Sequence, residues 1–322
     1  MKQPDLTDVI AAAGRIRNHI GRTPLVVSAT LSTPSAPVVL KLETRQITGS
    51  FKLRGATNAV QLLDMAAGRQ GVVAASTGNH ARALAHAARA RGLRCVVCMS
   101  ALVPANKVEA VRRLGADIRI VGQSQDNAQK EVDRLVTAEN LSPVPPFDDV
   151  RVIAGQGTIT LEILEERPDV TTILVPLSGG GLAGGIAMAA KRIRPSIRVI
   201  GISMERGAAM AASLKAGHPV EVPEQPTLAD SLGGGIGIPN FHTFALARDF
   251  LDEVILLTEK EIAEGIRHAY LNEGEIVEGA GAVGIAALLA GKVRTDGTTA
   301  IIVSGRNIDM SRHQKIVSLN DA

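Results

Sequence analysis

Lys52 is the residue of this chain best suited to covalent chemistry. It lies in the run Thr48-Gly-Ser-Phe-Lys-Leu-Arg-Gly55, between the apolar residues Phe51 and Leu53. A lysine whose ammonium group is desolvated loses its proton easily and becomes a nucleophile that can condense with an aldehyde. Taken alone, the run is more typical of a lysine at a helix start that a preceding hydroxyl caps. The other motifs of the chain must therefore show whether Lys52 is a reactive lysine or one at an ordinary helix start.

A run of three glycines, Ser178-Gly-Gly-Gly-Leu182, follows an apolar stretch and precedes an expected helix over residues 183–193. Successive glycines let backbone N–H groups converge on an anion, and the helix dipole assists, so the run predicts a phosphate cradle. A simple turn would not need three glycines, whose ordering costs entropy. Neither the P-loop signature Gly-Lys-Ser/Thr nor the spacing of a dinucleotide fingerprint is present, so we expect a smaller phosphorylated ligand.

Three further segments carry polar groups at expected strand ends or helix starts. Ser76-Thr-Gly-Asn-His80 can offer hydroxyl, amide and N–H groups to a carboxylate or a ring oxygen, and a helix cap would explain only one of its residues. Ser304 follows an expected strand, where an ordinary turn explains it equally well. Glu278 begins a glycine-rich helix, where the helix dipole alone would account for it. For His80 we favour a histidine buried against the helix start over a general base.

Composition excludes several classes of function. The chain has 322 residues, 45% of them hydrophobic, with 35 basic and 32 acidic side chains in near balance. With five Phe, one Tyr and no Trp, it has little to stack on bases, so we expect no nucleic-acid partner. Stretches such as 282–290 and 299–303 are too short to span a bilayer. The polar, acidic N-terminus is unlike a signal peptide, so we expect a cytoplasmic protein without a membrane role.

Both cysteines of the chain lie in Cys95-Val-Val-Cys98, a literal C-x-x-C. A redox pair sits at a helix N-terminus, which stabilises the thiolate. These cysteines flank a β-branched pair that predicts a strand, in which side chains three residues apart point to opposite faces. We therefore expect two structural cysteines.

Short apolar runs alternate with helical segments from Gly71 onward, which is typical of an α/β fold with parallel sheets flanked by helices. A first series has expected strands over 72–75, 95–99 and 118–121, and helices over 81–91, 105–114 and 126–139. A second series of strands begins at Val152 and continues over 173–176, 198–202 and 299–304. The N-terminal segment, with a helix over 6–20 and a strand over 38–42, is expected to join the second series. We predict a large cofactor-binding domain from residues 1–70 and 148–322, with a small α/β domain, residues 71–147, inserted in it.

A phosphate cradle combined with an activatable lysine, without a metal cluster or a nucleotide signature, indicates pyridoxal phosphate, a phosphorylated aldehyde. The chain resembles the fold type II pyridoxal-phosphate enzymes of the serine/threonine dehydratase group, which are tryptophan synthase β-like, over nearly its whole length. The matching stretches are Lys41-Leu-Glu43 with Thr48-Gly-Ser-Phe-Lys-Leu-Arg-Gly-Ala56, Ser76-Thr-Gly-Asn-His80, Pro146-Phe-Asp-Asp149 with Ala154-Gly-Gln-Gly-Thr158, Ser178-Gly-Gly-Gly-Leu182, and Ser304-Gly-Arg-Asn307.

The resemblance implies a role for each matching residue. Lys52 would hold the cofactor as a Schiff base and later move the Cα proton of the substrate. Thr77 would be a second catalytic residue, because racemases of this group carry a hydroxyl there that protonates the opposite face of Cα. The implied cofactor contacts are Phe51, Asn79 at the ring hydroxyl, Ser178, Gly179, Gly180, Gly181 and Leu182 at the phosphate, and Ser304 at the pyridine nitrogen. The implied substrate-binding residues are Ser76, Thr77, Gly78, Asn79 and His80.

The resemblance further implies elimination of water from a β-hydroxy amino acid, giving a 2-oxo acid and ammonia, by a homodimer or homotetramer. The stretches 201–208, 227–237 and 304–310 are similar to the hydroxyectoine-utilisation dehydratase branch. That similarity implies a hydroxylated diaminobutyrate derivative as substrate, with Arg82 or Arg306 reading its extra polar group. Ser203 stands where many relatives carry a metal-binding glutamate, so we expect no such metal site. The alternatives are a serine or threonine dehydratase, a racemase, a β-replacement synthase, and a non-catalytic binding protein of the same fold.

Overall fold

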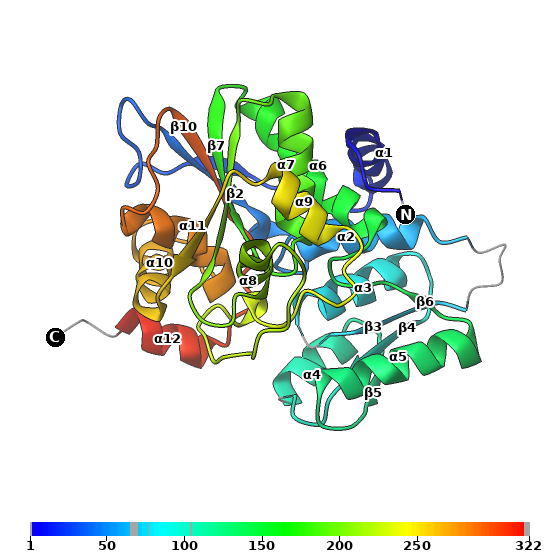
Figure 1. Cartoon of the computed structure of the whole chain (residues 1–322). Helices are drawn as coiled ribbons and strands as arrows, with labels where there is room; N and C mark the ends of the chain where they lie inside the picture. The colour runs from blue at the N-terminus through cyan, green and yellow to red at the C-terminus, as the bar shows by residue number, and fades with distance from the viewer. Residues whose placement is uncertain (1, 65–69, 77, 104, 319–322) are drawn as a thin grey trace.

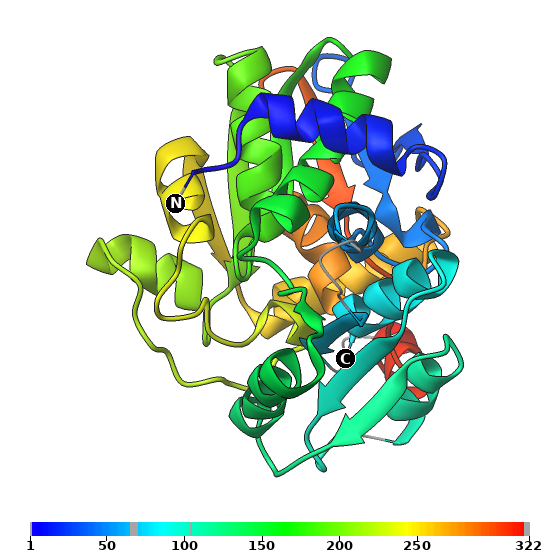
Figure 2. The same cartoon turned by 90° about the vertical axis from the view of Figure 1, so that its right-hand side faces the viewer.

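The computed structural model describes residues 2–64, 70–76, 78–103 and 105–318, and these build two sheets (Figure 1). The larger sheet has the strand order β1-β2-β10-β7-β8-β9, and the smaller has the order β5-β4-β3-β6. In Figure 1 the smaller sheet lies at the lower right with its helices, in cyan to green. Figure 2, turned by 90°, shows its strands below the helices that surround the larger sheet.

The larger sheet is parallel except for its first strand. β1 (Leu25–Val27) runs antiparallel to β2 (Val38–Leu42), while β10 (Thr298–Val303), β7 (Val170–Pro176), β8 (Arg198–Met204) and β9 (Glu253–Leu257) follow in parallel. The central strands are almost wholly buried because helices cover both faces. Leu174 packs in one core with α10 (Glu259–Leu271), α11 (Gly279–Leu289) and α12 (Met310–Ser318). Its neighbours Ile173 and Val175 pack in another with α6 (Val150–Glu166), α7 (Gly181–Ile193) and α9 (Thr243–Phe250).

The smaller sheet is parallel throughout. It contains β3 (Val72–Ala75), β4 (Cys95–Met99), β5 (Asp117–Ile120) and β6 (Ser142–Pro143), with α3 (Asn79–Ala90), α4 (Ala105–Arg112) and α5 (Gln125–Glu139) as its helices. The helix α2 (Lys52–Gln61) contributes Leu53, Ala56 and Val60 to the core that contains β3, β4 and α3. The helix that begins at Lys52 is therefore packed against the smaller unit.

The remaining elements are α1 (Leu6–Ile16), α8 (Ala209–Ala216) and two 3-10 turns, η1 (Glu43–Arg45) and η2 (Asp230–Leu232). Between α8 and α9 the chain runs through residues 217–242 with only η2 as regular structure. Loops of that length in a compact fold usually serve a function.

The expected strands over 38–42, 72–75 and 95–99 have the bounds that the sequence predicted, and most other elements differ only at their ends. The expected helix over 6–20 stops at Ile16. The strand expected at Val152 is wrong, because Val152 lies in the first turn of α6. Asp149 caps this helix, its Oδ1 accepting the N–H of Arg151 at 2.8 Å and that of Val152 at 3.4 Å. The domain boundaries proposed from the sequence stay a prediction.

Cys95 and Cys98 are both free and buried in β4, and they belong to different core clusters on opposite faces of the sheet. Burial raises the pKa of Cys95 to about 12 and that of Cys98 to about 11. The expectation of structural cysteines is confirmed.

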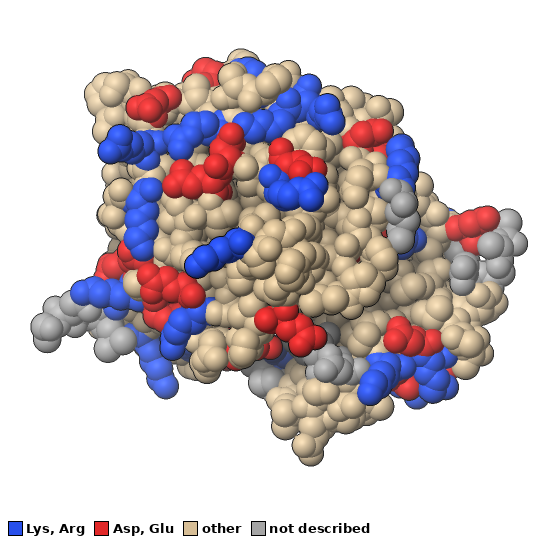
Figure 3. Space-filling model, in the orientation of Figure 1, with Lys and Arg blue, Asp and Glu red and all other residues tan. Residues whose placement is uncertain are grey.

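None of the helices in the described part of the chain is both long and apolar enough to cross a membrane. The face seen in Figure 3 carries Lys and Arg interspersed with Asp and Glu, so no extended basic patch forms on it.

Candidate active site

A cavity of about 390 Å³ takes its wall from segments of both units. Almost every site residue that the sequence indicated lines it: Phe51, Lys52, Ser76, Gly78, Asn79, His80, Ser178, Gly179, Gly180, Gly181, Leu182 and Ser304. Thr77 lies outside the described residues. These segments converge because each follows a parallel strand at its carboxyl end or begins a helix there.

Lys52 is the first residue of α2, and its Nζ donates to the carbonyl oxygen of Pro146 at 2.6 Å. The ammonium also lies 5.3 Å from the ring centroid of Phe51. Burial lowers the pKa of Lys52 to about 8, against the opposing effect of the Glu278 carboxylate. The amine is thus much easier to deprotonate than that of a surface lysine.

The loop before Lys52 is fixed to the Ser304 loop by backbone hydrogen bonds. The N–H of Phe51 donates to the carbonyl oxygen of Ser304 at 3.0 Å, and the N–H of Arg306 donates to that of Gly49 at 2.9 Å. Gly49 has a φ of 77°, a left-handed conformation that favours glycine. Lys52 and Ser304, which are far apart in the sequence, therefore have a set separation.

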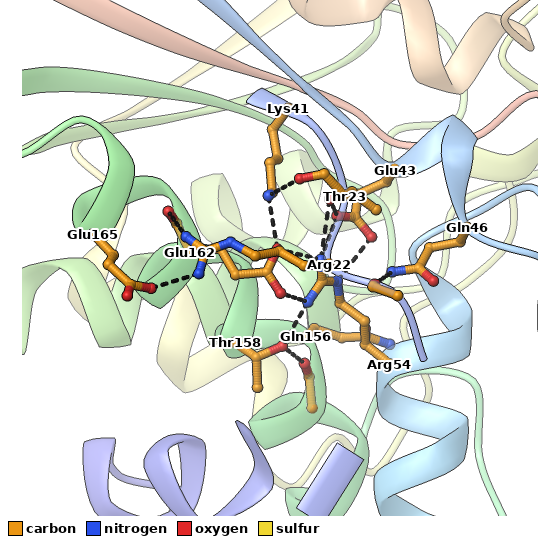
Figure 4. A network of polar contacts seen from close by, with 12 residues as sticks. Arg22, Thr23, Lys41, Glu43, Gln46, Arg54, Gln156, Thr158, Glu162 and Glu165 are labelled. Carbon is orange, nitrogen blue, oxygen red and sulfur yellow. Dashed lines mark hydrogen bonds and ion pairs between the residues drawn. The ribbon is translucent and has the colours of Figure 1, made fainter. Parts of the chain in front are cut away.

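A buried ionic network holds α2 from its other side (Figure 4). Arg54 is fully buried, and its Nε and Nη2 donate to Glu43 at 2.8 Å each. Its Nη1 and Nη2 donate to Glu162 at 2.6 and 2.8 Å. Lys41, also fully buried, donates to Glu162 at 2.7 Å and to the carbonyl oxygen of Thr23 at 2.6 Å.

Two cations and two carboxylates thus neutralise one another in this network. Burial acts to lower the pKa of Arg54, but Glu43 and Glu162 outweigh it and raise the pKa, so the guanidinium stays charged. Because removing one partner of a buried pair leaves an uncompensated charge, the network fixes the position of α2 strongly. Arg54 lies two residues after Lys52, so the same contacts fix the start of α2 at Lys52.

The glycine run forms the start of α7, with Gly180 as the N-cap at a φ of 87°. A Cβ added at Gly179 would lie 2.5 Å from the ring of Phe147, and one at Gly181 would lie 2.9 Å from the Phe147 backbone. Glycine is therefore required here for close packing as well as for conformation. The first N–H groups of a helix have no partner in that helix, so this wall of the cavity presents donors and the positive end of a dipole.

The segment 76–80 leads from β3 into α3. The Oγ of Ser76 accepts the N–H of Ala81 at 3.2 Å, so it satisfies one N–H of the first turn of α3, while the N-cap position itself is Gly78. His80 is buried, and its Nε2 lies 2.7 Å from the carbonyl oxygen of Val144. Burial lowers the pKa of His80 to about 3, so the ring is neutral. This agrees with a buried histidine rather than a general base.

Glu278 is more than the acidic helix start that the sequence indicated. Its side chain makes no capping hydrogen bond in α11 and instead lines the cavity, where Asn79 Nδ2 donates to its Oε1 at 2.6 Å. Ser231 Oγ donates to its Oε2 at 3.4 Å. Burial raises the pKa of Glu278 to about 7, while the hydrogen bond from Asn79 acts in the opposite direction.

Sequence reasoning missed the wall of the cavity formed by residues 230–235, together with Lys107 and Glu224. Asp230 pairs with Lys107 of α4 at 3.6 Å, so this loop connects to the smaller unit. In the sequence, the glycine run 233–235 was the signal that could have indicated this wall. Arg82 and Arg306, which were expected to read a polar group of the substrate, are not among the described residues that line the cavity. The cavity therefore gives that expectation no support.

The cavity fits pyridoxal phosphate. It offers an easily deprotonated amine at Lys52, a glycine cradle whose packing leaves no room for a Cβ, and the hydroxyl of Ser304, whose only described acceptor is the carbonyl oxygen of Ala280 at 3.4 Å. His80 Nδ1 is buried and has no hydrogen-bond partner among the described residues, so one ring nitrogen at the cavity is free to accept. Groups of three or more His, Cys, Asp or Glu able to hold a metal do not occur among the described residues.

The model of the pyridoxal-phosphate dependent enzymes matches residues 16–305. The chain belongs to this family. The enzyme is 39% identical to the L-threonine ammonia-lyase of Thermotoga maritima over 315 residues, which are 97% of this chain and 78% of that protein. It is 38% identical to the catabolic L-threonine dehydratase TdcB of Escherichia coli K12 over 321 residues, covering 98% and 97% of the two chains.

Among solved structures, maize serine racemase superposes on the enzyme with a TM-score of 0.92 at 34% identity, covering 98% of this chain and 97% of that one. The processed form of threonine deaminase isoform 2 from Solanum lycopersicum gives a TM-score of 0.90 at 33% identity, covering 98% and 92%. The α/β fold type II architecture, the pyridoxal phosphate cofactor and the assignment to the dehydratase-like ammonia-lyases are confirmed. The roles of individual site residues and the oligomeric state stay predictions.

Proposed function

We propose that the enzyme removes water from a β-hydroxy amino acid and releases a 2-oxo acid and ammonia. The observation that carries the proposal is the amine of Lys52, with a pKa lowered to about 8, placed in one cavity with the glycine cradle at 179–181. The names of the relatives, threonine ammonia-lyase and threonine dehydratase, support the same reaction class.

Bound in the cavity, pyridoxal phosphate would supply an aldehyde for covalent attachment and an electron sink that acidifies the Cα–H bond of an attached amino acid. Lys52 would bind the aldehyde at rest, and its amine, once displaced by the substrate, would take the Cα proton. The N–H groups of Gly179 to Leu182 would bind the phosphate. The neutral Ser304 hydroxyl would face the ring nitrogen without protonating it, which favours elimination over transamination.

The loop 76–80 would bind the substrate carboxylate. Ser76, Gly78 and Asn79 line the cavity close to the N-terminus of α3, where the helix dipole favours an anion. Because His80 is neutral, it adds no positive charge there. These groups orient the amino acid so that its Cα–H bond faces Lys52.

For the substrate we propose a hydroxylated diaminobutyrate derivative, with threonine and serine as the alternatives. Apart from its chain neighbours, a Cβ added at Gly235 would meet no described atom closer than 4.0 Å, so this wall is open at Gly235, which suits a side chain longer than that of threonine. Glu224 lines the same wall and makes no hydrogen bond or ion pair with the described residues. A free carboxylate suits the extra amino group of such a substrate.

A panel of serine, threonine, 3-hydroxyaspartate and hydroxyectoine-derived amino acids tests the substrate. We expect release of 2-oxo acid and ammonia, fastest with the diaminobutyrate derivative and slowed in Glu224→Gln with that substrate only. Much faster turnover of serine or threonine would reject the diaminobutyrate proposal. No release from any β-hydroxy amino acid would reject the reaction itself.

The variant Lys52→Ala tests the role of the lysine independently of the other residues of the site. We expect wild-type enzyme to show a visible absorption band that borohydride abolishes, with the cofactor then attached to Lys52. The variant should bind cofactor without that band and should not eliminate water. Full turnover by Lys52→Ala would mean that another group takes the Cα proton.

A racemase is a second candidate, because maize serine racemase is 34% identical and superposes closely. Racemisation needs a second acid on the face of Cα opposite to Lys52. Chiral analysis of unreacted L-serine during turnover separates the two, since a pure lyase leaves no D-serine.

A further inference from the structure

Asn79 is held by hydrogen bonds that allow its side-chain amide only one orientation. Its Oδ1 accepts from Nδ2 of Asn307 at 2.6 Å, while its own Nδ2 donates to Oε1 of Glu278 at 2.6 Å. Turning the amide over would place two NH₂ groups against each other on one side and two oxygens on the other. Asn79 and Glu278 are both buried, so water cannot replace either bond at low cost.

The orientation of Asn307 is itself fixed by the backbone. Its Nδ2 also donates to the carbonyl oxygen of Thr48 at 2.9 Å, and a carbonyl can only accept. A Cβ at Gly49 would lie 2.8 Å from Oδ1 of Asn307, so glycine is needed for this approach. The hydrogen bonds therefore start at the Asn307 amide, which donates to Thr48 and to Asn79, and Asn79 donates in turn to Glu278; we name these four residues the relay.

The end of the relay is enclosed as well. A Cβ at Gly305 would overlap Oε1 of Glu278, and the backbone N–H of Glu278 donates to the carbonyl oxygen of Gly305 at 3.1 Å. Ser231, from the loop 230–235 that lines the cavity, donates to Oε2 of Glu278. One carboxylate thus contacts the helix start at Asn79, the Ser304 loop and the loop 230–235.

We propose that Glu278 and Asn307 are positioning residues that fix the amide of Asn79 toward the cofactor ring. Because one N–H of the Asn79 amide is bound to Glu278, the relay leaves its second N–H for the cavity. The inference rests on the proposed function and on the contact between Asn79 and the ring hydroxyl of pyridoxal phosphate that the family resemblance implies. A donor at that oxygen would change both the affinity for the cofactor and the ratio of its absorption bands.

The test is a double-mutant cycle on the apoenzyme, with Glu278→Ala, Asn79→Ala and the double variant. The readouts are the dissociation constant of pyridoxal phosphate and the band ratio of the bound cofactor. We expect each single variant to bind the cofactor roughly tenfold more weakly, the size of one well-placed hydrogen bond. If Glu278 acts through Asn79, the double variant should be no weaker than Asn79→Ala, because coupled residues are not additive.

Glu278→Gln and Asn307→Ala complete the experiment. Glutamine keeps an acceptor for Asn79 and should restore affinity and band ratio, while Asn307→Ala should resemble Glu278→Ala. Additive losses in the cycle, or a glutamine variant as impaired as the alanine one, would overturn the proposal. Since these readouts need no substrate, an enzyme that binds the cofactor but eliminates no water would reject the proposed function and still test the relay.

Glu275→Ala is the matched control. Glu275 is a buried glutamate three residues away whose partners are Thr44 and Arg45 instead of the cavity. The variant Glu275→Ala should lower the stability of the apoenzyme without changing the ratio of the absorption bands of the bound cofactor. If Glu278→Ala does not fold, Glu278→Gln and Asn307→Ala still test whether Asn79 is held by the relay, because both variants keep the packing at Glu278.

Discussion

At the scale of single residues, the environment of Lys52 sets the pH at which the enzyme can capture its cofactor. Only the neutral amine attacks an aldehyde. Burial lowers the pKa of Lys52 to about 8, the nearby Glu278 opposes this, and His80 is neutral. About one tenth of the amine is therefore neutral at pH 7 and about nine tenths at pH 9, whereas an ordinary lysine would be almost wholly protonated at both.

We predict that the rate of cofactor capture by the apoenzyme rises about tenfold between pH 7 and pH 9 and then levels off. Stopped-flow measurement of the visible band gives the rate, and Lys52→Ala, which forms no such band, is the control. A rate still rising tenfold per pH unit above pH 9 would show a lysine of ordinary pKa.

The place of a residue in the cavity was predictable from the sequence where the motif is contiguous, as for Lys52 and the glycines 179–181. The role of Glu278 was not, because its partners Asn79 and Ser231 lie 199 and 47 residues away. A helix start with a glutamate has an ordinary explanation in the helix dipole, and only the fold reveals that the side chain turns elsewhere.

At the scale of elements, α2 transmits the buried network to the active site. Arg54 lies in the same first turn of α2 as Lys52 and joins segments that contain Thr23, Glu43 and Glu162. Breaking a buried ion pair is costly, whereas exposed pairs contribute little. The same region contains a buried and an exposed ion pair, because Arg22 pairs with Glu165 at 2.7 Å near the surface.

We predict that Arg54→Met lowers the free energy of unfolding of the apoenzyme by about 3–5 kcal/mol, because Glu43 is left buried without a counter-charge. Arg22→Met, the exposed control in the same view, should cost less than about 1 kcal/mol. Urea unfolding of the two variants in parallel checks this. Equal losses would mean that the network does not anchor α2.

The start of α7 gives a second prediction at this scale. In Gly179→Ala the new methyl group would meet the Phe147 ring at 2.5 Å, so the loop must shift. We expect roughly tenfold weaker binding of pyridoxal phosphate, with little change for pyridoxal, which lacks the phosphate. Gly14→Ala in α1 is the control, since nothing lies within 4 Å of its added Cβ. An equal loss for both ligands would argue against a phosphate cradle at α7.

At the scale of the whole molecule, the cavity depends on both units. Lys52 and Asn79 begin helices that pack with the smaller sheet, while the glycine cradle and Ser304 follow strands of the larger one. A ligand that contacts all of them binds the folded state only. It must therefore stabilise both units together.

We predict that pyridoxal phosphate at one hundred times its dissociation constant adds about 2.7 kcal/mol to the free energy of unfolding. Pyridoxal at the same concentration should add less, because it cannot use the donors of α7. Thermal unfolding of the apoenzyme with each compound measures both effects. Equal stabilisation by the two compounds would contradict a cofactor held at both ends.

The alternation of strands and helices was predictable because parallel strands buried on both faces are continuous apolar runs. Val152 was assigned to a strand because an apolar run in a buried helix has no distinguishing period over a few residues. The wall at 230–235 was missed for a different reason. It belongs to a long irregular loop, and no periodic pattern says which side of the molecule such a loop covers.

The two cysteines of β4 have a practical consequence. Because both thiols are buried and have raised pKa values of about 12 and about 11, they form little thiolate at neutral pH. Native enzyme should therefore be nearly inert to maleimides while folded. A single cysteine introduced at the exposed Glu224 would then react selectively with a fluorescent maleimide. The two native cysteines would not have to be replaced before the motion of the loop along the cavity is followed by fluorescence.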